Sequence, residues 1–499
     1  MSVGTIALFV AEPIEALEMK SLTFAISLLL VFATNAGVVA QDKNVLIVFM
    51  DDLRPELNCY GESHIKSPNI DALATQGILF NRAYCQQALC GPSRISMMSG
   101  MYPDTTGICD LWTPLTKKIP NAMSMPRYFK QRGYETFSFG KVYHHNRDDK
   151  NNWSHLEPKD TVKYADSETL AGIKQRTEEG KRNGVDIDQL RKLGKGPATE
   201  VADVDDNAYP DGRTANAAIE SLRRNKDKPF FMCVGFTKPH LPFAAPKRYW
   251  DLYRRDQFDV PERTLPANAP SLAFTKWGEL RNYLGMPKKG PLSDAQTREL
   301  KHGYAASVSF ADAQVGKVLD ELDRLGLRKN TIVVLWGDHG YKLGEYGAWC
   351  KHTNLELDTR VPFIVSAPGF VRGERSDSLV EMVDVFPTLA ELTGGEIPDS
   401  CDGKSLEAIL SKPNTSIRAF AISQYPRGTT MGYSLRNERW RYTEWFNSKS
   451  KKVVARELYD HETSSLANQN LASDPKHADL IAGLSKQLDV AERTKSRRE

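Results

Sequence analysis

Two unbroken apolar runs constrain the fold of this chain more than any other feature. They cover residues 45–50 (VLIVFM) and 331–336 (TIVVLW), and neither alternates apolar with polar residues. Strands that are apolar on both faces occur mainly in parallel sheets covered by helices. Two further strands are expected at 134–139 and 230–236. The sequence therefore predicts an α/β fold with a large, mixed but mostly parallel sheet flanked by helices.

Hydrophobic spacing predicts the helices, and a change of pattern divides the chain. The clearest helix is expected at about 302–325, where apolar residues recur at helical spacing. From about residue 413, short alternating segments predict antiparallel strands. We therefore expect a large domain over 41–412 and a smaller C-terminal antiparallel subdomain over 413–499. Further helices are expected at about 167–182, 214–224 and 476–493.

The N-terminus is typical of an export signal. Lys20 precedes an apolar run at 22–32, and residues 38–40 (VVA) have the small-residue form of a cleavage site. Because the charged region begins at Met19, we expect Met19 to be the true start and residues 1–40 to be an extension plus signal peptide. The run is too short for a stable membrane span. Export would place the protein in the periplasm or medium of a bacterium, or in the lysosome or extracellular space of a eukaryote.

The charge balance argues against a nucleic-acid partner. The chain has 66 Lys and Arg against 63 Asp and Glu, a net charge of +3, so any affinity for anions must be local. It has seven cysteines. One of them belongs to the motif described below, and the remaining even number permits disulfides without requiring any. The oligomeric state stays open.

Acidic residues follow both of the strongest strands. Asp51 and Asp52 come directly after the first run, and Asp338 and His339 follow the second after one glycine. Ligands of open α/β sheets bind beyond the carboxyl ends of the strands, so these side chains should lie close together. A solvated loop start would explain either pair alone. Two such pairs favour a site of hard oxygen ligands for a divalent cation.

A short motif around Cys90 predicts an anion site. Cys90-Gly91-Pro92-Ser93-Arg94 leads into a helix-like run at 95–100. Pro92 suits the first turn of a helix, so Cys90 is expected just before the helix, near its free N–H groups and positive dipole end. Arg94, one turn in, adds a bidentate donor for a tetrahedral oxyanion. Taken alone, the motif also fits a structural cysteine beside a turn.

Lysine and histidine follow the remaining strands. Lys141 and His144 come after 134–139, His240 after 230–236, and Lys351 after the second acid pair. A single lysine is usually a solvated surface charge. Several cations at a strand edge that already carries acids indicate a binding site for an anion, where histidines can also move protons near neutral pH.

Cys-x-Pro-Ser-Arg resembles the signature of the type I sulfatases, and the resemblance extends over nearly the whole mature chain. It implies an alkaline-phosphatase-like fold and oxidation of Cys90 to formylglycine by a formylglycine-generating or equivalent maturation enzyme. It also implies one calcium ion per chain, with magnesium as the alternative, bound by Asp51, Asp52, Asp338, His339 and residue 90. One departure is Met101, because the family usually has an arginine after the Gly100 equivalent.

The resemblance also implies a mechanism. The hydrate of formylglycine 90 would be the nucleophile, with its oxyanion stabilised by the metal and Arg94. Lys141 would hold the sulfate oxygens, and His240 and Lys351 would assist departure of the sugar oxygen. His144 would be the base that lets the second hydroxyl expel sulfate and restore the aldehyde.

Within that family the chain resembles the iduronate-2-sulfatase branch, through segments such as Gln86-Gln87, Lys238-Pro239-His240 and Gln424-Tyr425-Pro426-Arg427. This implies a sulfated glycan substrate, and the leading candidate for the bond that is cleaved is the 2-O-sulfate ester of a terminal uronate. Arg427 is a candidate for the uronate carboxylate, and a surface arginine is an equally good interpretation. Three alternatives remain: another sulfated polysaccharide or monoester, a phosphoryl hydrolase of the same superfamily, and a non-catalytic glycan-binding relative. Cys90 with Arg94 argues against the second, and the intact set of site residues against the third.

Overall fold

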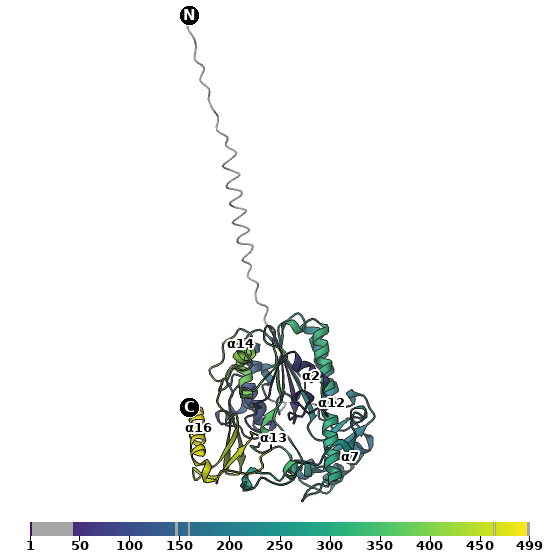
Figure 1. Cartoon of the computed structure of the whole chain (residues 1–499). Coiled ribbons are helices and arrows are strands. Elements are labelled where there is room, and N and C mark those ends of the chain that lie inside the picture. Colours follow the sequence, from purple (N-terminus) through teal and green to yellow (C-terminus); the bar gives the residue numbers. More distant parts are fainter. Residues whose placement is uncertain (2–42, 145–147, 158–159, 463, 465, 497–499) are drawn as a thin grey trace. The chain divides into compact units, whose positions relative to one another are not determined.

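The predicted buried strands form the middle of an eight-stranded sheet in the computed structural model (Figure 1). The central strand, β1, pairs in parallel with β9 and β7, and β7 pairs in parallel with β4. The sheet is mixed, because β13 runs antiparallel to both β9 and β2. Its strands, in spatial order, are β14 (Glu374–Ser376), β2 (Ile78–Phe80), β13 (Phe363–Ser366), β9 (Thr331–Gly337), β1 (Asn44–Asp51), β7 (Phe230–Pro239), β4 (Glu135–Gly140) and β5 (His155–Leu156).

The structure describes residue 1 and residues 43–496, apart from 145–147, 158–159, 463 and 465. The predicted signal peptide, including its start at Met19, therefore lies outside the described residues. From Lys43 onward the described chain forms one structural unit. Within these residues, no helix is both long enough and apolar enough to cross a bilayer.

Alternation along β1 builds a separate hydrophobic core on each face of the sheet. Leu46, Val48 and Met50 point to a core that includes the apolar face of α12 (Asp294–Arg324). Val45, Ile47 and Phe49 point to a second core with α3 (Cys90–Ser99) and α14 (Val385–Leu392). Successive strand residues face opposite sides, so a strand apolar throughout must have helices on both. Figure 1 shows α12 in teal and α14 in green on opposite sides of the sheet.

The predicted helices are present, and two of them start earlier than expected. The helix expected at 302–325 is α12, which begins at Asp294. Its extra turns follow a capping box: Ser293 Oγ accepts from the Gln296 amide, and the Gln296 side chain accepts from the Ser293 amide. The helix expected at 214–224 is α9, which starts earlier on a proline at its first position. The other α-helices are α2 (Pro68–Thr75), α4 (Pro103–Thr106), α5 (Leu115–Lys118), α6 (Met125–Gln131), α7 (Ser167–Arg182), α8 (Ile187–Leu193), α9 (Pro210–Asn225), α10 (Lys247–Trp250), α11 (Gly278–Arg281), α13 (Glu356–Thr359), α15 (Glu407–Ser411) and α16 (Ala478–Ser496).

The C-terminal residues form a four-stranded antiparallel meander, as the alternating pattern predicts. Leu484 and Leu488 of α16, yellow in Figure 1, pack with Ile422, Leu435 and Leu458 of the sheet. The strands are β16 (Ala421–Arg427), β17 (Thr430–Arg436), β18 (Trp440–Asn447) and β19 (Lys452–Asp460). The remaining strands are β3 (Ala83–Tyr84), β6 (Thr199–Ala202), β8 (Phe243–Pro246), β10 (Lys342–Leu343), β11 (Trp349–Cys350), β12 (Arg360–Val361) and β15 (Val380–Glu381).

A buried ion cluster joins this small sheet to α13 and to β3, which is part of a three-stranded sheet with β12 and β15. Glu356 of α13 pairs with Arg436 at 3.0 Å and with Arg441 at 2.7 Å, from β17 and β18. Its second oxygen accepts from the Tyr84 hydroxyl of β3 at 2.9 Å. All four side chains are buried. The domain boundary at 412/413 stays a prediction.

Candidate active site

The end of β1 brings two adjacent carboxylates to one place. Side chains alternate along a strand, so Asp51 and Asp52 would normally point to opposite faces. The register with β7 shifts after Met50, and Asp52 has a φ of 62°. This left-handed conformation is one that aspartate tolerates better than most residues. It lets the Asp52 amide donate to Asp338 Oδ1 at 3.0 Å, so both carboxylates lie beside the end of β9.

The predicted helix after Cys90 is α3, with Cys90 as its first residue rather than the one before it. Leu89 is the extended residue at its N-terminus. Cys90 and Arg94 are four positions apart and share one face of the helix. Cys90 Sγ lies 3.2 Å from His339 Nε2. A Cβ on Gly91 would lie 2.7 Å from the Asp110 carbonyl oxygen, so only glycine lets α3 approach this closely.

Arg94 holds the acidic strand ends together. Its side chain is fully buried, and its guanidinium donates to Asp51 Oδ1 at 3.2 Å and to Asp338 Oδ2 at 2.9 Å. It also donates to the carbonyl oxygens of Lys141 and Val142, just after β4. One arginine therefore contacts the carboxyl ends of β1, β4 and β9.

Two buried lysines complete the charge balance. Lys141 Nζ donates to Asp51 Oδ2. Lys351 Nζ donates to both oxygens of Asp52, at 2.8 and 2.9 Å. Burial opposes the charged form of each lysine, but their carboxylate partners outweigh it and raise both pKa values. Both lysines therefore stay cationic in the site.

The structure adds one residue that the sequence analysis missed, Glu279 of α11. Its carboxylate lies 3.1 Å from His240 Nε2 and 3.0 Å from Lys351 Nζ. Burial alone would raise its pKa, but the charges of Lys351 and His240 hold the pKa of Glu279 well below its ordinary value. His240 Nδ1 lies 2.6 Å from the Leu241 carbonyl oxygen. Because that oxygen can only accept, Nδ1 carries a proton and Nε2 faces the carboxylates.

Two predicted site residues, His144 and Arg427, have described contacts with residues outside the cluster around Arg94. The ring of His144 packs edge-on against Trp112, with centroids 6.3 Å apart. The Arg427 guanidinium stacks over the Tyr425 ring at 4.6 Å and donates to the carbonyl oxygens of Leu272, Pro426 and His352. Arg427 thus ties β16 to two loops, and its role toward substrate stays a prediction.

The surroundings of Cys90 disfavour a thiolate. Burial, followed by the charge of Asp51, raises the pKa of the Cys90 thiol well above its ordinary value. An unmodified Cys90 is therefore a neutral thiol, which is a poor nucleophile. All seven cysteines lie in the described part of the chain, and all are separate thiols.

The donor set fits a divalent cation. Ligand atoms of Asp52, Cys90 and His339 lie within 4.8 Å of one another, and the same is true of Asp51, Cys90 and Asp338. Three carboxylates with one imidazole are a set dominated by hard oxygen donors, which suits calcium or magnesium better than zinc or copper.

Comparison with known proteins agrees with this geometry. The sulfatase family model matches residues 43–395. A second model, the C-terminal region of N-sulphoglucosamine sulphohydrolase, matches residues 344–494. Human iduronate 2-sulfatase is 32% identical, covering 90% of this chain and 94% of its own length. The mouse enzyme is also 32% identical, covering 88% and 93%.

Solved structures share the fold at lower identity. A phosphonate monoester hydrolase of Agrobacterium radiobacter superposes with a TM-score of 0.73 at 20% identity, covering 91% of this chain and 96% of the other. A 2-O GAG sulfatase superposes with a TM-score of 0.69 at 23% identity, covering 92% and 93%. These likenesses confirm the predicted alkaline-phosphatase-like fold. With the match to the family model over most of its length, the chain belongs to the sulfatase family and is a sulfuric ester hydrolase, with iduronate 2-sulfatases among its relatives.

Proposed function

We propose that this sulfatase removes the 2-O-sulfate of a terminal uronate on a sulfated glycan, with iduronate 2-sulfate as the first candidate. The observation that carries the proposal is the 32% identity to human iduronate 2-sulfatase over 90% of the chain. The match covers 90% of this chain and 94% of the human enzyme, so it is not confined to the segments that carry the predicted site residues. A sulfatase acting on another sulfated polysaccharide is the second candidate, supported by the 29% identity to a Formosa agariphila sulfatase.

In this proposal a calcium or magnesium ion is held by Asp51, Asp52, Asp338, His339 and residue 90, and formylglycine replaces Cys90. When bound, the ion would act as a Lewis acid that stabilises negative charge on oxygen. The formylglycine would supply a hydrated aldehyde as nucleophile, which the neutral Cys90 thiol cannot replace.

The charges of the described site agree with a sulfate monoester as ligand. Four carboxylates face three permanent cations and His240, which is a fourth cation when it is protonated at both ring nitrogens. With His240 protonated these charges balance, so a divalent ion would make the site positive, as a ligand with one negative charge requires. The groups counted are Asp51, Asp52, Asp338 and Glu279 against Arg94, Lys141, Lys351 and His240.

The remaining residues form two groups, one on the side of the nucleophile and one on the side of the leaving group. Arg94 and Lys141 lie on the Asp51 side, where they would fix the nucleophile and the sulfate oxygens. His240 and Lys351 lie on the Asp52 side, where they would stabilise the departing sugar oxygen, His240 by giving its Nε2 proton. His144 keeps its predicted role as the base that releases sulfate.

The test offers defined disaccharides that carry either a uronate 2-sulfate or a hexosamine 6-sulfate and measures released sulfate. We expect preference for the uronate ester, and no turnover by Cys90→Ala. Preference for the hexosamine ester would overturn the proposed substrate while leaving the sulfatase assignment intact. Arg427→Ala should raise KM for the uronate ester more than for an aryl sulfate. Equal increases for both substrates would show that Arg427 does not bind the uronate carboxylate.

Maturation and export are tested on the same preparation. Mass spectrometry of the peptide around position 90 should show formylglycine when the maturation enzyme is co-expressed, and an unmodified thiol in active protein would refute the nucleophile. N-terminal sequencing of exported protein should begin near Gln41, and an intact residue 20–40 segment in that protein would refute the signal peptide.

A further inference from the structure

A basic pocket lies where α7, α8 and the loop after α11 meet. It has a volume of about 490 Å³, which is within the ~300–1,000 Å³ typical of ligand pockets. Four of its lining residues are cationic, and none is acidic: Arg176, Lys192, Lys195 and Lys288. Apolar side chains, among them Tyr283 and Leu284, make up much of the remaining wall.

The four cations have no carboxylate partner among the described residues. Arg176 donates to the Lys195 carbonyl oxygen at 3.2 Å, and Lys288 Nζ donates to the Arg281 carbonyl oxygen at 2.7 Å. Lys195 Nζ donates to the Tyr283 hydroxyl at 3.2 Å and lies 4.3 Å from the centre of that ring. Unbalanced positive charge above an apolar wall suits a ligand that combines anionic groups with C–H surfaces, as a sulfated sugar does.

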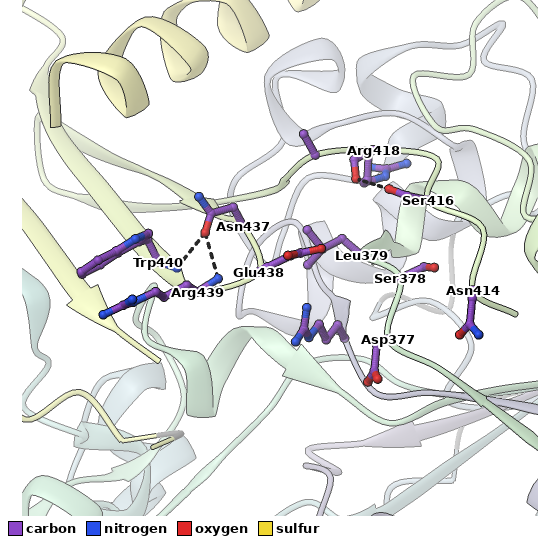
Figure 2. A pocket seen from close by; sticks show the side chains of 12 residues that line it. Asp377, Ser378, Leu379, Asn414, Ser416, Arg418, Asn437, Glu438, Arg439 and Trp440 are labelled. Carbon is purple, nitrogen blue, oxygen red and sulfur yellow. Dashed lines mark hydrogen bonds between the residues drawn. The ribbon is translucent and has the colours of Figure 1, made fainter. Parts of the chain in front are cut away.

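A second pocket offers a contrast. It has a volume of about 650 Å³ and lies between residues 377–379 and the loop 437–440 (Figure 2). Its charges are mixed, because Asp377 and Glu438 accompany its arginines. In Figure 2, Asn437 Oδ1 accepts from the backbone amides of Arg439 and Trp440, so its polar groups stabilise the loop itself. None of the predicted site residues lines it.

The basic pocket and the active site share one short segment of the chain. Glu279, which contacts His240 and Lys351, and Tyr283, which lines the pocket, are four residues apart on α11 and its C-terminal turn. Burial lowers the pKa of Lys195, and Glu279 and Lys351 are close enough to affect it in opposite directions. The pocket therefore lies near Glu279, on the side of the active site where we expect the departing sugar.

We propose that the basic pocket binds the sugar residues that follow the reacting one, so that this enzyme acts on anionic oligosaccharides in preference to monosaccharide sulfates. The proposal rests on the proposed function, because the reacting sugar must sit at residue 90. A sulfate or carboxylate of the next sugar binds Lys192 and Lys288 at the mouth. The sugar ring lies on Leu284, which is 51% exposed.

The test compares K192A/K288A with K174A/K289A. All four lysines are exposed, and only the first pair lines the pocket. The substrates are a sulfated tetrasaccharide with a terminal uronate 2-sulfate and the matching monosaccharide sulfate. Exposed ion pairs each contribute about 0.5 kcal/mol, so K192A/K288A should raise KM for the tetrasaccharide about fivefold at low salt. KM for the monosaccharide should stay within about twofold, as should every value for K174A/K289A.

An unchanged KM for the tetrasaccharide, or equal changes for both substrates, would overturn the pocket. A second measurement needs no variant: saturating tetrasaccharide should protect Lys192 and Lys288 of the wild-type protein from acetylation, and should leave Lys174 and Lys289 unprotected. Equal labelling of all four would also overturn it. A different result would refute the proposed function alone. In that case the formylglycine-containing wild type would release no sulfate, although the tetrasaccharide still protected Lys192 and Lys288 from acetylation.

Discussion

The contact of Glu279 with two cations leads to a specific prediction about the leaving group. Glu279→Gln keeps the size of the side chain and removes its charge. The glutamate holds His240 Nε2 at 3.1 Å and Lys351 Nζ at 3.0 Å, and these are the groups that we expect to assist the departing oxygen. The charges of Lys351 and His240 lower its pKa, so it is ionised near neutral pH. Glu279 is thus a positioning residue that acts through His240 and Lys351.

The expected loss follows from these two contacts. Hydrogen bonds to charged groups contribute about 1.5–3 kcal/mol, and glutamine can still accept from one of the two partners. A loss of about 1.4 kcal/mol in the transition state corresponds to about tenfold in kcat. The loss should appear with a sugar sulfate, whose alkoxide needs a proton or a cation as it leaves. It should stay within about twofold for 4-nitrophenyl sulfate, because that phenolate leaves without help.

The assay measures kcat for both substrates with Glu279→Gln and with Glu62→Gln. Glu62 lies 3.6 Å from His64 on the surface, so it provides the same substitution beside a histidine away from the site. Equal losses on both substrates would refute the leaving-group argument. An increase in kcat would also refute it, because it would mean that Glu279 competes with the sulfate for Lys351.

Three further predictions concern the metal, the joint between the sheets and pH. Asp338→Ala should abolish the divalent ion found by elemental analysis and lower turnover at least about 100-fold, whereas Asp323→Ala, on the exposed end of α12, should change neither. Glu356→Gln leaves two buried arginines without their partner and should lower the free energy of unfolding in urea by about 3–5 kcal/mol; Glu444→Gln, which affects a more exposed pair, should cost at most about 1 kcal/mol. Burial raises the pKa of Asp312 to about 6 from 3.8, so the folded state binds this proton more tightly and stability should decline as pH rises from about 4 to 6. Asp312→Asn should flatten that decline by about 3 kcal/mol, and an unchanged pH profile in urea unfolding would refute the assignment.

The positions of the site residues that follow strand ends could be predicted from the sequence. Apolar runs fix which strands are central, and the carboxyl ends of parallel strands meet at one edge. Asp51 follows a predicted strand directly, Asp338 and Lys141 each follow one after a single glycine, and the structure brings the three together around Arg94. The geometry of Asp52 could not be predicted, because it depends on a single positive φ and a shift in register.

Glu279 could not have been found in the same way. It stands between α10 and α12, where α11 has four residues and no periodicity marks a buried face. Its partners lie 39 and 72 residues away along the chain, and only the folded loop brings them near. The early start of α12, in contrast, had a local signal in Ser293 and Gln296 that a search for capping boxes would detect.

The buried cluster around Glu356 also limits how this protein can be recombined with its relatives. The two family models overlap between residues 344 and 395, and Glu356 lies in the overlap. Arg436 and Arg441, its partners, lie beyond it. A crossover at residue 412 would take the arginines from one parent and the glutamate from another. Chimeric sulfatases with a foreign C-terminal sheet should therefore fold only when the crossover lies before Glu356, or when both parents supply the same three charges.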